Sequence, residues 1–261
     1  MTRRWARVLT LGALLLAPRA ARAQDTTQAA PPPPADTATV PRALPVNGLL
    51  LRPQHLRYQM RIVTPDSSHV VGDRDVDVRQ GTYGGFPAWV VAETRGGAVR
   101  SSDSLYLSYV DLRPLHWTSM IGGQARLALE FTADSVYGGT SGPTGARTIV
   151  LAHGRDLLTG AAMTDVAFEL MPHTVGRVDS VSVLVIDLGA SRVLPGTVSV
   201  DGEQDVETPT GRVHCWVVRL STAEGEVQYW VSELDPTVVR TRQTLPGHPD
   251  STFEETLLSR Q

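Results

Sequence analysis

Residues 125–131 read ARLALEF, a stretch in which an apolar side chain stands at every second position. Side chains of a β-strand point alternately to the two faces of a sheet, so this period of two predicts a strand with one buried face. The stretch 180–185, SVSVLV, repeats the pattern with three valines at alternate positions. Both stretches therefore predict half-buried strands.

Similar stretches recur along most of the chain after residue 56. Glycine-containing turns at Gly96-Gly97, Gly122-Gly123, Asp201-Gly202 and Pro246-Gly247 separate them at short intervals. Short connections without long helices are typical of antiparallel sheets. The further predicted strands are Leu56–Val63, Val70–Val78, Ala88–Thr94, Ser104–Val110, Thr148–Ala152, Val198–Asp201, Arg212–Leu220, Val227–Ser232 and Val238–Thr244.

One segment, Leu158–Met171, departs from the alternation. Its apolar residues are spaced by three and four, and Pro172 follows it. This spacing predicts a short amphipathic helix that ends at the proline. A helix laid against a curved sheet can plug an open barrel.

The N-terminal part has the features of an export signal. Three arginines precede the uncharged apolar run Val8–Ala17, and Ala21-Arg22-Ala23 forms a small-x-small cleavage site. We predict a signal peptide at 1–23 cleaved near Ala23, a disordered linker rich in Pro, Ala and Thr at 24–46, and a single β-rich domain at 47–261. The expected location is the periplasm or the extracellular medium.

Neither type of membrane-spanning structure is favoured by the sequence. The apolar run is about half the length of a transmembrane helix. A transmembrane barrel is disfavoured because the predicted strands contain charged residues and the chain has few aromatic residues.

Charge and cysteine content limit the classes of partner. Five of the 24 arginines lie in residues 1–23, so a chain cleaved there keeps 19 basic against 27 acidic residues, a formal charge of −8. This balance argues against nucleic acid as the partner.

Cys215 is the only cysteine of the sequence, so no intramolecular disulfide is expected. Because it lies in a predicted strand, we expect it to be a small buried apolar side chain.

The sequence shows no catalytic or metal-binding motif, and we predict a protein that is not an enzyme and has no cofactor. Seven histidines lack ligand-like spacing, and residues 138–146 are predicted to be a flexible hairpin loop, not a nucleophile elbow. Asp73, Asp75 and Asp77 alternate along one strand and predict a solvated outer face. On the opposite face only Val76 and Val78 are expected to mark the interior.

The remaining candidates for function are apolar and aromatic side chains. Each is either an ordinary core residue, the favoured interpretation, or part of a cavity between sheet and helix that takes an apolar ligand. The candidate ligand-binding residues are Trp89, Trp117, Phe131, Met163, Trp216 and Trp230.

Residues 206–218, VETPTGRVHCWVV, followed by Tyr229-Trp230-Val231-Ser232 and Val238-Val239-Arg240, resemble the DUF3108-like proteins. Asp111–Leu115 and Leu170-Met171-Pro172 resemble two further elements of that family. The resemblance implies a fold similar to the lipoprotein-carrier (LolA/LolB-like) group, periplasmic and uncharacterised. The expected fold class is therefore mainly β, a curved antiparallel sheet or unclosed β-barrel with one or two short helices.

Three functions follow from these features. The leading one is a soluble envelope protein that binds a lipid or acyl chain on the concave face of its sheet. The alternative is a non-enzymatic envelope interaction or scaffold module that uses an exposed sheet edge or the Pro-rich segment. A hydrolase with a dispersed site is the least favoured, because no local motif supports it.

Overall fold

The computed structural model describes residues 44–142, 145–154, 156–186 and 191–261. The predicted signal peptide at 1–23 and most of the predicted linker lie outside these residues. At the end of that linker Leu44 is buried, and Val46 packs against the same core.

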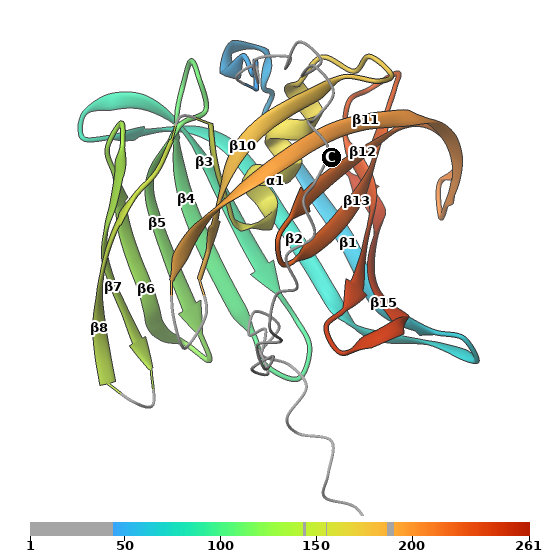
Figure 1. Cartoon of the computed structure of the whole chain (residues 1–261), viewed down its shortest axis with the longest axis horizontal. Coiled ribbons are helices and arrows are strands. Elements are labelled where there is room, and N and C mark those ends of the chain that lie inside the picture. The colour runs from blue at the N-terminus through green and yellow to red at the C-terminus, as the bar shows by residue number, and fades with distance from the viewer. Residues whose placement is uncertain (1–43, 143–144, 155, 187–190) are drawn as a thin grey trace, which may run out of the picture.

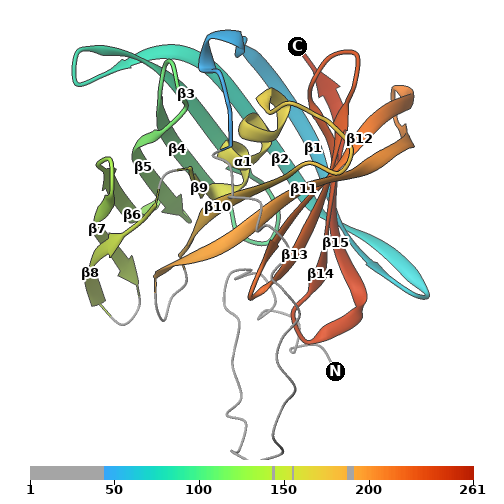
Figure 2. The ribbon, with the colours of Figure 1, turned by 45° about the horizontal axis from the view of Figure 1, so that its top comes forward.

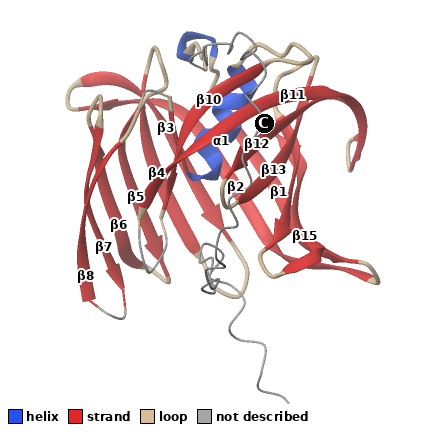
Figure 3. Cartoon of the chain, viewed as in Figure 1, coloured by secondary structure: helices blue, strands red, loops and turns tan. Residues whose placement is uncertain are grey.

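The described residues form one sheet of 15 strands, a short 3-10 helix η1 (Gly48–Leu50) and one α-helix, α1 (Gly160–Leu170) (Figure 3). The strands are β1 (Gln54–Thr64), β2 (Ser67–Tyr83), β3 (Phe86–Arg95), β4 (Ser101–Ser108), β5 (Pro114–Ile121), β6 (Gln124–Phe131), β7 (Ser135–Gly142), β8 (Gly145–Ala152), β9 (Leu157–Thr159), β10 (Val178–Val185), β11 (Arg192–Thr208), β12 (Gly211–Thr222), β13 (Gly225–Ser232), β14 (Val238–Leu245) and β15 (His248–Arg260).

The sheet consists of two arms that meet at β1. One arm runs from β2 to β8 in sequence order, and the other runs from β15 back to β9. Neighbouring strands are antiparallel except β9 and β10, which are parallel. The sheet curves round α1, and its end strands β8 and β9 are not joined by hydrogen bonds (Figures 1 and 2). The predicted fold class, a curved and unclosed antiparallel sheet with short helices, is confirmed.

Helix α1 lies inside this curve and packs against β3, β9 and β14. Every residue from Ala162 to Glu169 is buried. The helix ends one residue before Met171, whose backbone is extended as expected of a residue that precedes a proline. The predicted helix at 158–171 is thus confirmed, shortened by β9 at its start.

An apolar core fills most of the space between α1 and the sheet. One cluster of buried side chains joins α1 to strands of both arms, and it includes Phe168, Tyr229 and Trp89. A second cluster contains Leu129 and Ile149 from one arm with Leu184 from the other. The two unpaired edges are therefore bridged by side-chain packing although no backbone ladder connects them.

Two predictions about turns need correction. The hairpin predicted at 138–146 is present, but much of the predicted loop is strand, because β7 continues to Gly142 and β8 begins at Gly145. A Cβ on Gly138 would lie 2.1 Å from the carbonyl oxygen of Ala128, so this glycine permits close strand approach instead of marking a turn. Asp201-Gly202 lies inside β11, where the register with β12 shifts, and marks a bulge.

Gly72 on β2 is a second site of close approach, and it supports a testable prediction about the fold. A Cβ at Gly72 would lie 2.0 Å from the carbonyl oxygen of Gly96. We expect Gly72→Ala to lower the free energy of unfolding by about 1–3 kcal/mol, because the backbone contact must open. Chemical denaturation measures this loss. Gly202→Ala is the control, since no atom lies within 4 Å of its added Cβ; equal stability of the two variants would contradict the prediction.

Candidate functional site

The interior of the sheet contains a fully buried arginine, Arg74 on β2. The sequence analysis expected only Val76 and Val78 to mark this face, and that expectation was too narrow. Arg74 is in phase with the valines, and the intervening Asp73 and Asp75 are on the outer face, where both interact with Arg57. The alternation of inner and outer residues along β2 was predicted correctly, but Arg74 was not counted as an inner residue because it is charged.

Three buried carboxylates surround the Arg74 guanidinium. Its Nε donates to Glu93 Oε2 on β3 at 3.0 Å, Nη2 to Asp165 Oδ2 on α1 at 2.7 Å, and Nη1 to Glu255 Oε2 on β15 at 2.8 Å. The ring of Tyr58 lies 5.1 Å from the guanidinium carbon. A charge taken out of water is tolerated only when it is paired and hydrogen-bonded, and these contacts meet that condition.

A second arginine, Arg95 at the end of β3, joins the same group. Its Nε donates to Glu93 Oε1, and Nη1 lies 3.5 Å from Glu255 Oε1. We call Arg74, Arg95, Glu93, Asp165 and Glu255 the Arg74 cluster. It ties both arms of the sheet to α1.

The carboxylates of the cluster differ in acidity. Burial alone would raise the pKa of Glu93, but the guanidiniums of Arg74 and Arg95 lower it to about 2. Burial raises the pKa of Asp165 to about 6, since Arg74 compensates only in part and Glu255 adds to the increase. Asp165 is therefore much closer to protonation at neutral pH than Glu93.

A fourth carboxylate, Glu169, fixes the other end of α1. Its Oε2 accepts from Gln54 Nε2 on β1 at 2.9 Å, and its Oε1 accepts from the backbone N–H of Val238 on β14 at 3.2 Å. Burial raises the pKa of Glu169 to about 8. Asp165 and Glu169 are spaced by four residues, so they share one helix face and both face the sheet.

A cavity of about 360 Å³ adjoins the Arg74 cluster at the start of α1. We call it the α1 cavity. Its polar lining includes Asp165, Arg95 and Glu255 from the cluster. Its apolar lining comes from both arms of the sheet and includes Met60, Val71, Ile121, Val227, Tyr229 and Phe253.

One polar atom in this wall is unsatisfied. Asp165 is 2% exposed, and its Oδ1 has no hydrogen-bond partner in the described part of the chain. Buried carboxylate oxygens are nearly always hydrogen-bonded, so an unpartnered one beside a cavity needs an explanation. The α1 cavity thus combines apolar walls with a free acceptor, the composition of sites for small amphiphilic ligands.

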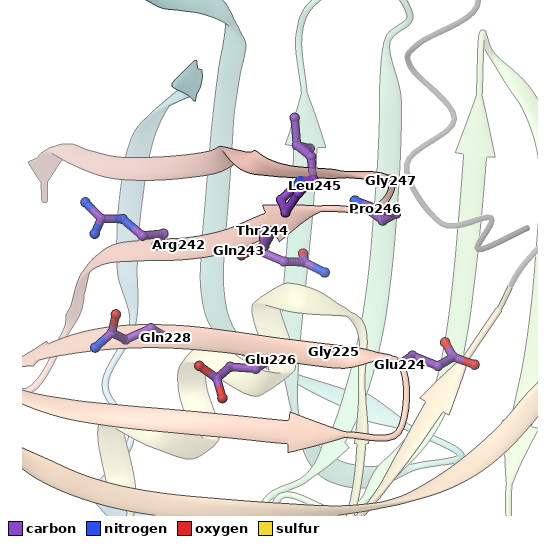
Figure 4. A pocket seen from close by; sticks show the side chains of 11 residues that line it. Glu224, Gly225, Glu226, Gln228, Arg242, Gln243, Thr244, Leu245, Pro246 and Gly247 are labelled. Atoms are coloured by element: carbon purple, nitrogen blue, oxygen red, sulfur yellow. The ribbon is translucent and has the colours of Figure 1, made fainter. Parts of the chain in front are cut away.

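Two other hollows differ in chemistry. A cavity of about 440 Å³ lies along another face of α1 and is lined by Leu112, Leu158 and Met163 among others. A hollow of about 530 Å³ lies over β13, β14 and the β14–β15 turn. Figure 4 shows the side chains that line it. Its charged side chains are paired, Glu226 with Arg219 and Arg242 with Glu254, which leaves little to recognise a ligand.

None of the six predicted ligand-binding residues lines the α1 cavity, but four of them, Trp89, Trp117, Met163 and Trp216, belong to or pack against the main core cluster. Trp89 is buried in the main core and donates from Nε1 to the carbonyl oxygen of Gly48 at 3.0 Å. Trp117 is half-buried between the two larger clusters, and Phe131 belongs to the second. Met163 lines the 440 Å³ cavity.

The last two candidates lie on the other arm. Trp216 is half-buried, with its ring stacked on His173 at 6.0 Å between centroids. Trp230 faces away from α1, in a separate cluster with Val217 and the buried Cys215, and it donates from Nε1 to Gln204. Cys215 is a buried small hydrophobe, as predicted.

The acidic and basic residues of the Arg74 cluster were missed at the sequence level, although a signal was present. Arg74 shares the phase of Val76, Glu93 shares that of Trp89 and Val91, and Asp165 lies within the predicted helix. A charged residue in phase with buried apolar residues can be recognised as part of an interior ion pair only when the strands that supply its partners are known.

Within the described ranges, no three His, Cys, Asp or Glu side chains gather as a group able to hold a metal ion. No helix in those ranges has both the length and the apolar character needed to cross a bilayer.

Comparison with known families identifies the chain. Residues 57–250, well over half of the sequence, match the model of a family described as a protein of unknown function, DUF3108. The chain belongs to the DUF3108 family. This confirms the resemblance seen in residues 206–240. None of the curated proteins matches this DUF3108 chain.

Several solved structures are similar at low sequence identity. A β-barrel-like protein of the DUF1849 domain of unknown function from Brucella abortus is 9% identical with a TM-score of 0.49, over 83% of this chain and 99% of its own. A putative exported protein with a YmcC-like fold from Bacteroides fragilis is 12% identical with a TM-score of 0.33, over 80% and 95%. The hypothetical lipoprotein YmcC from Escherichia coli is 12% identical with a TM-score of 0.32, over 81% and 86%. None of these three descriptions names an enzyme.

The Arg74 cluster leads to a prediction about stability. Arg74→Met removes the positive charge and leaves three carboxylates buried around an apolar side chain. We expect the free energy of unfolding to fall by about 3–5 kcal/mol, the usual result of breaking a buried pair. Arg57→Met is the matched control, because its pair with Asp73 is exposed to solvent and contributes little to stability. Equal denaturation midpoints for the two variants would show that Arg74 is not a central element.

Glu169 leads to a prediction about pH. In the folded state it keeps its proton up to about pH 8, against an ordinary value of 4.5, so its contribution to stability is complete below pH 4.5 and is lost as pH rises through 8. Glu169→Gln removes this loss, because the amide does not titrate. It can accept from Val238 N–H, and, once the Gln54 amide turns over, it can donate to Gln54 Oε1, which has no partner among the described residues. Between pH 5 and 9 the variant should lose less stability than the wild type, by on the order of 2–4 kcal/mol.

Thermal unfolding across that pH range measures the effect. Glu226→Gln, at an exposed position, is the control and should follow the wild-type pH profile. A Glu169→Gln profile parallel to the wild type would mean that Glu169 is already ionised in the folded protein.

Proposed function

We propose that this DUF3108 chain is an exported, non-enzymatic envelope protein that binds an amphiphilic ligand, a lipid or acyl chain, in the α1 cavity. The single observation behind the proposal is an apolar cavity next to an unpartnered buried carboxylate oxygen. Apart from the 440 Å³ cavity, much of the remaining concave face is filled by the protein's own side chains. Ligand binding is therefore assigned to one end of the curve and not to the whole face.

The size and walls of the cavity support a ligand with a hydrocarbon part. Protein interiors are close-packed, and voids larger than a water molecule are few. A volume of about 360 Å³ falls in the range of small-molecule pockets, roughly 300–1,000 Å³. Apolar side chains from β1, β13 and β15 line it, so burial of an alkyl chain there would gain about 0.8 kcal/mol for each methylene removed from water.

Export is supported by the N-terminal sequence. A basic segment, a short uncharged apolar run and a small-x-small site form the tripartite pattern of a signal peptide. A protein carried across the membrane in this way meets lipids and lipid-linked molecules in its compartment. The proposed ligand class and the proposed location are therefore consistent.

The edge of the sheet supports a second candidate, an interaction module. β8 is the last strand of its arm and pairs only with β7 among the described residues, and Val150 on it is exposed. An unpaired edge can accept a strand from a partner. This candidate does not account for the cavity or for Asp165.

The experiment that tests the proposal is mass spectrometry of the protein exported to a periplasm and purified without detergent. We expect the native spectrum to show an additional mass that is lost on organic extraction. Val227→Phe should abolish the additional mass, because the larger ring enters the α1 cavity. Val150→Phe, on the outside of β8, is the control and should retain it.

A bare polypeptide mass for the wild type, confirmed after incubation with extracted envelope lipids, would overturn the proposal. Capture of envelope proteins that is lost when β8 carries a proline would then favour the interaction module. A ligand that survives in Val227→Phe would place binding elsewhere, the 440 Å³ cavity being the next candidate.

A further inference from the structure

The polar end of the α1 cavity contains more acceptors than donors. Asp165 Oδ2 is used by Arg74, and Asp165 Oδ1 is left without a partner among the described residues. A neutral or cationic donor would satisfy this oxygen, whereas a further acceptor would not.

The charge around the cavity has the same bias. The Arg74 cluster contains two guanidiniums and three carboxylates, all three of them no more than 4% exposed. Asp103 on β4 is directly opposite Glu93 in the strand register, so it shares the inner face, and its Oδ1 is also buried without a partner in the described residues. Four carboxylates therefore face two guanidiniums on this part of the interior.

Arg74 is fully engaged by its carboxylates, and Arg95 is engaged through two of its three nitrogens. Arg74 uses Nε, Nη1 and Nη2 for its three carboxylates, and it is fully buried. Arg95, which lines the cavity, directs Nε to Glu93 and Nη1 toward Glu255. An anionic ligand would have to compete with these internal carboxylates and would approach Asp165 and Glu255, both of like charge.

We propose that the polar end of the ligand is a protonated amine, which donates to Asp165 Oδ1 while its hydrocarbon chain lies against Ile121, Val227 and Phe253. This inference rests on the proposed function, since it names the chemical class of the ligand in the same cavity. An ammonium group has three donors and a positive charge, so it satisfies the free oxygen and offsets the excess of carboxylates. Tyr229, which lines the same cavity, adds an aromatic surface near the charge.

The test compares three ligands that share one alkyl chain and differ only in the head group. Dodecylamine, dodecanol and dodecanoate are titrated at pH 7.4 below their aggregation limits, and each displaces the neutral fluorescent probe N-phenyl-1-naphthylamine from the wild-type protein. We expect dodecylamine to bind at least 10-fold more tightly than dodecanol, and dodecanoate to bind most weakly.

The outcomes separate this inference from the proposed function. Equal binding of all three ligands would support an apolar cavity and overturn recognition of the amine. If dodecanoate bound most tightly, Arg95 would determine which head group is preferred, and recognition of the amine would again be overturned. If none of the three displaces the probe or binds directly in calorimetry, the proposed function fails as well.

A substitution at Asp165 gives a second measurement. Asp165→Asn keeps an oxygen that can accept from Arg74 and places an N–H group at the free position, so it exchanges an acceptor for a donor. We expect the preference for dodecylamine over dodecanoate to fall at least 10-fold. Asp73→Asn, on the outer face of β2, removes the same charge from the surface and should keep the wild-type order. If Asp165→Asn does not fold, the head-group series on the wild type alone decides.

Discussion

The buried charge of Arg74 is the constraint on which the rest of the structure depends. An arginine without solvent must be surrounded by acceptors, because the cost of removing its charge from water is otherwise too large. The acceptors come from β3, α1 and β15, at positions 93, 165 and 255. The hydrogen bonds of the Arg74 side chain therefore hold the first strands, the helix and the last strand together.

This arrangement explains how a sheet that is not closed by hydrogen bonds keeps its curvature. β1 lies between β2 and β15, and the Arg74–Glu255 ion pair crosses directly over it. Helix α1 is attached at two points, through Asp165 to Arg74 and through Glu169 to Gln54 and Val238. The apolar clusters supply most of the buried area, while the charged contacts select where the helix lies against it.

The same contacts leave a site at one end of the helix. Asp165 contributes one oxygen to the structural ion pair, its other oxygen has no partner among the described residues, and the residue lines the α1 cavity. In the proposed function, one carboxylate thus serves both stability and ligand recognition. Apolar clusters fill much of the interior, and the proposed ligand is therefore assigned to the α1 cavity, where the helix begins.

The sequence by itself determined the mainly β architecture, most of the strands, the single helix and the family, because alternation, turn residues and helical spacing are local properties of the chain. Period two in residues 125–131 and the TPTGRVHCW motif needed no tertiary information. Only the tertiary structure decided the function of Arg74, Asp165, Glu169 and Glu255, since a charged side chain becomes an interior ion pair through partners that lie as many as 181 residues away. The glycines of β7 show the same limit: Gly138 reads locally as a turn, and its value as a point of close approach depends on Ala128 of the neighbouring strand. The aromatic residues were expected to line a cavity because size and apolarity are visible in sequence. The position of the cavity depends on where the side chains of the two arms and of α1 leave space between them. That space is set by the packing of the whole domain and cannot be read from any one segment.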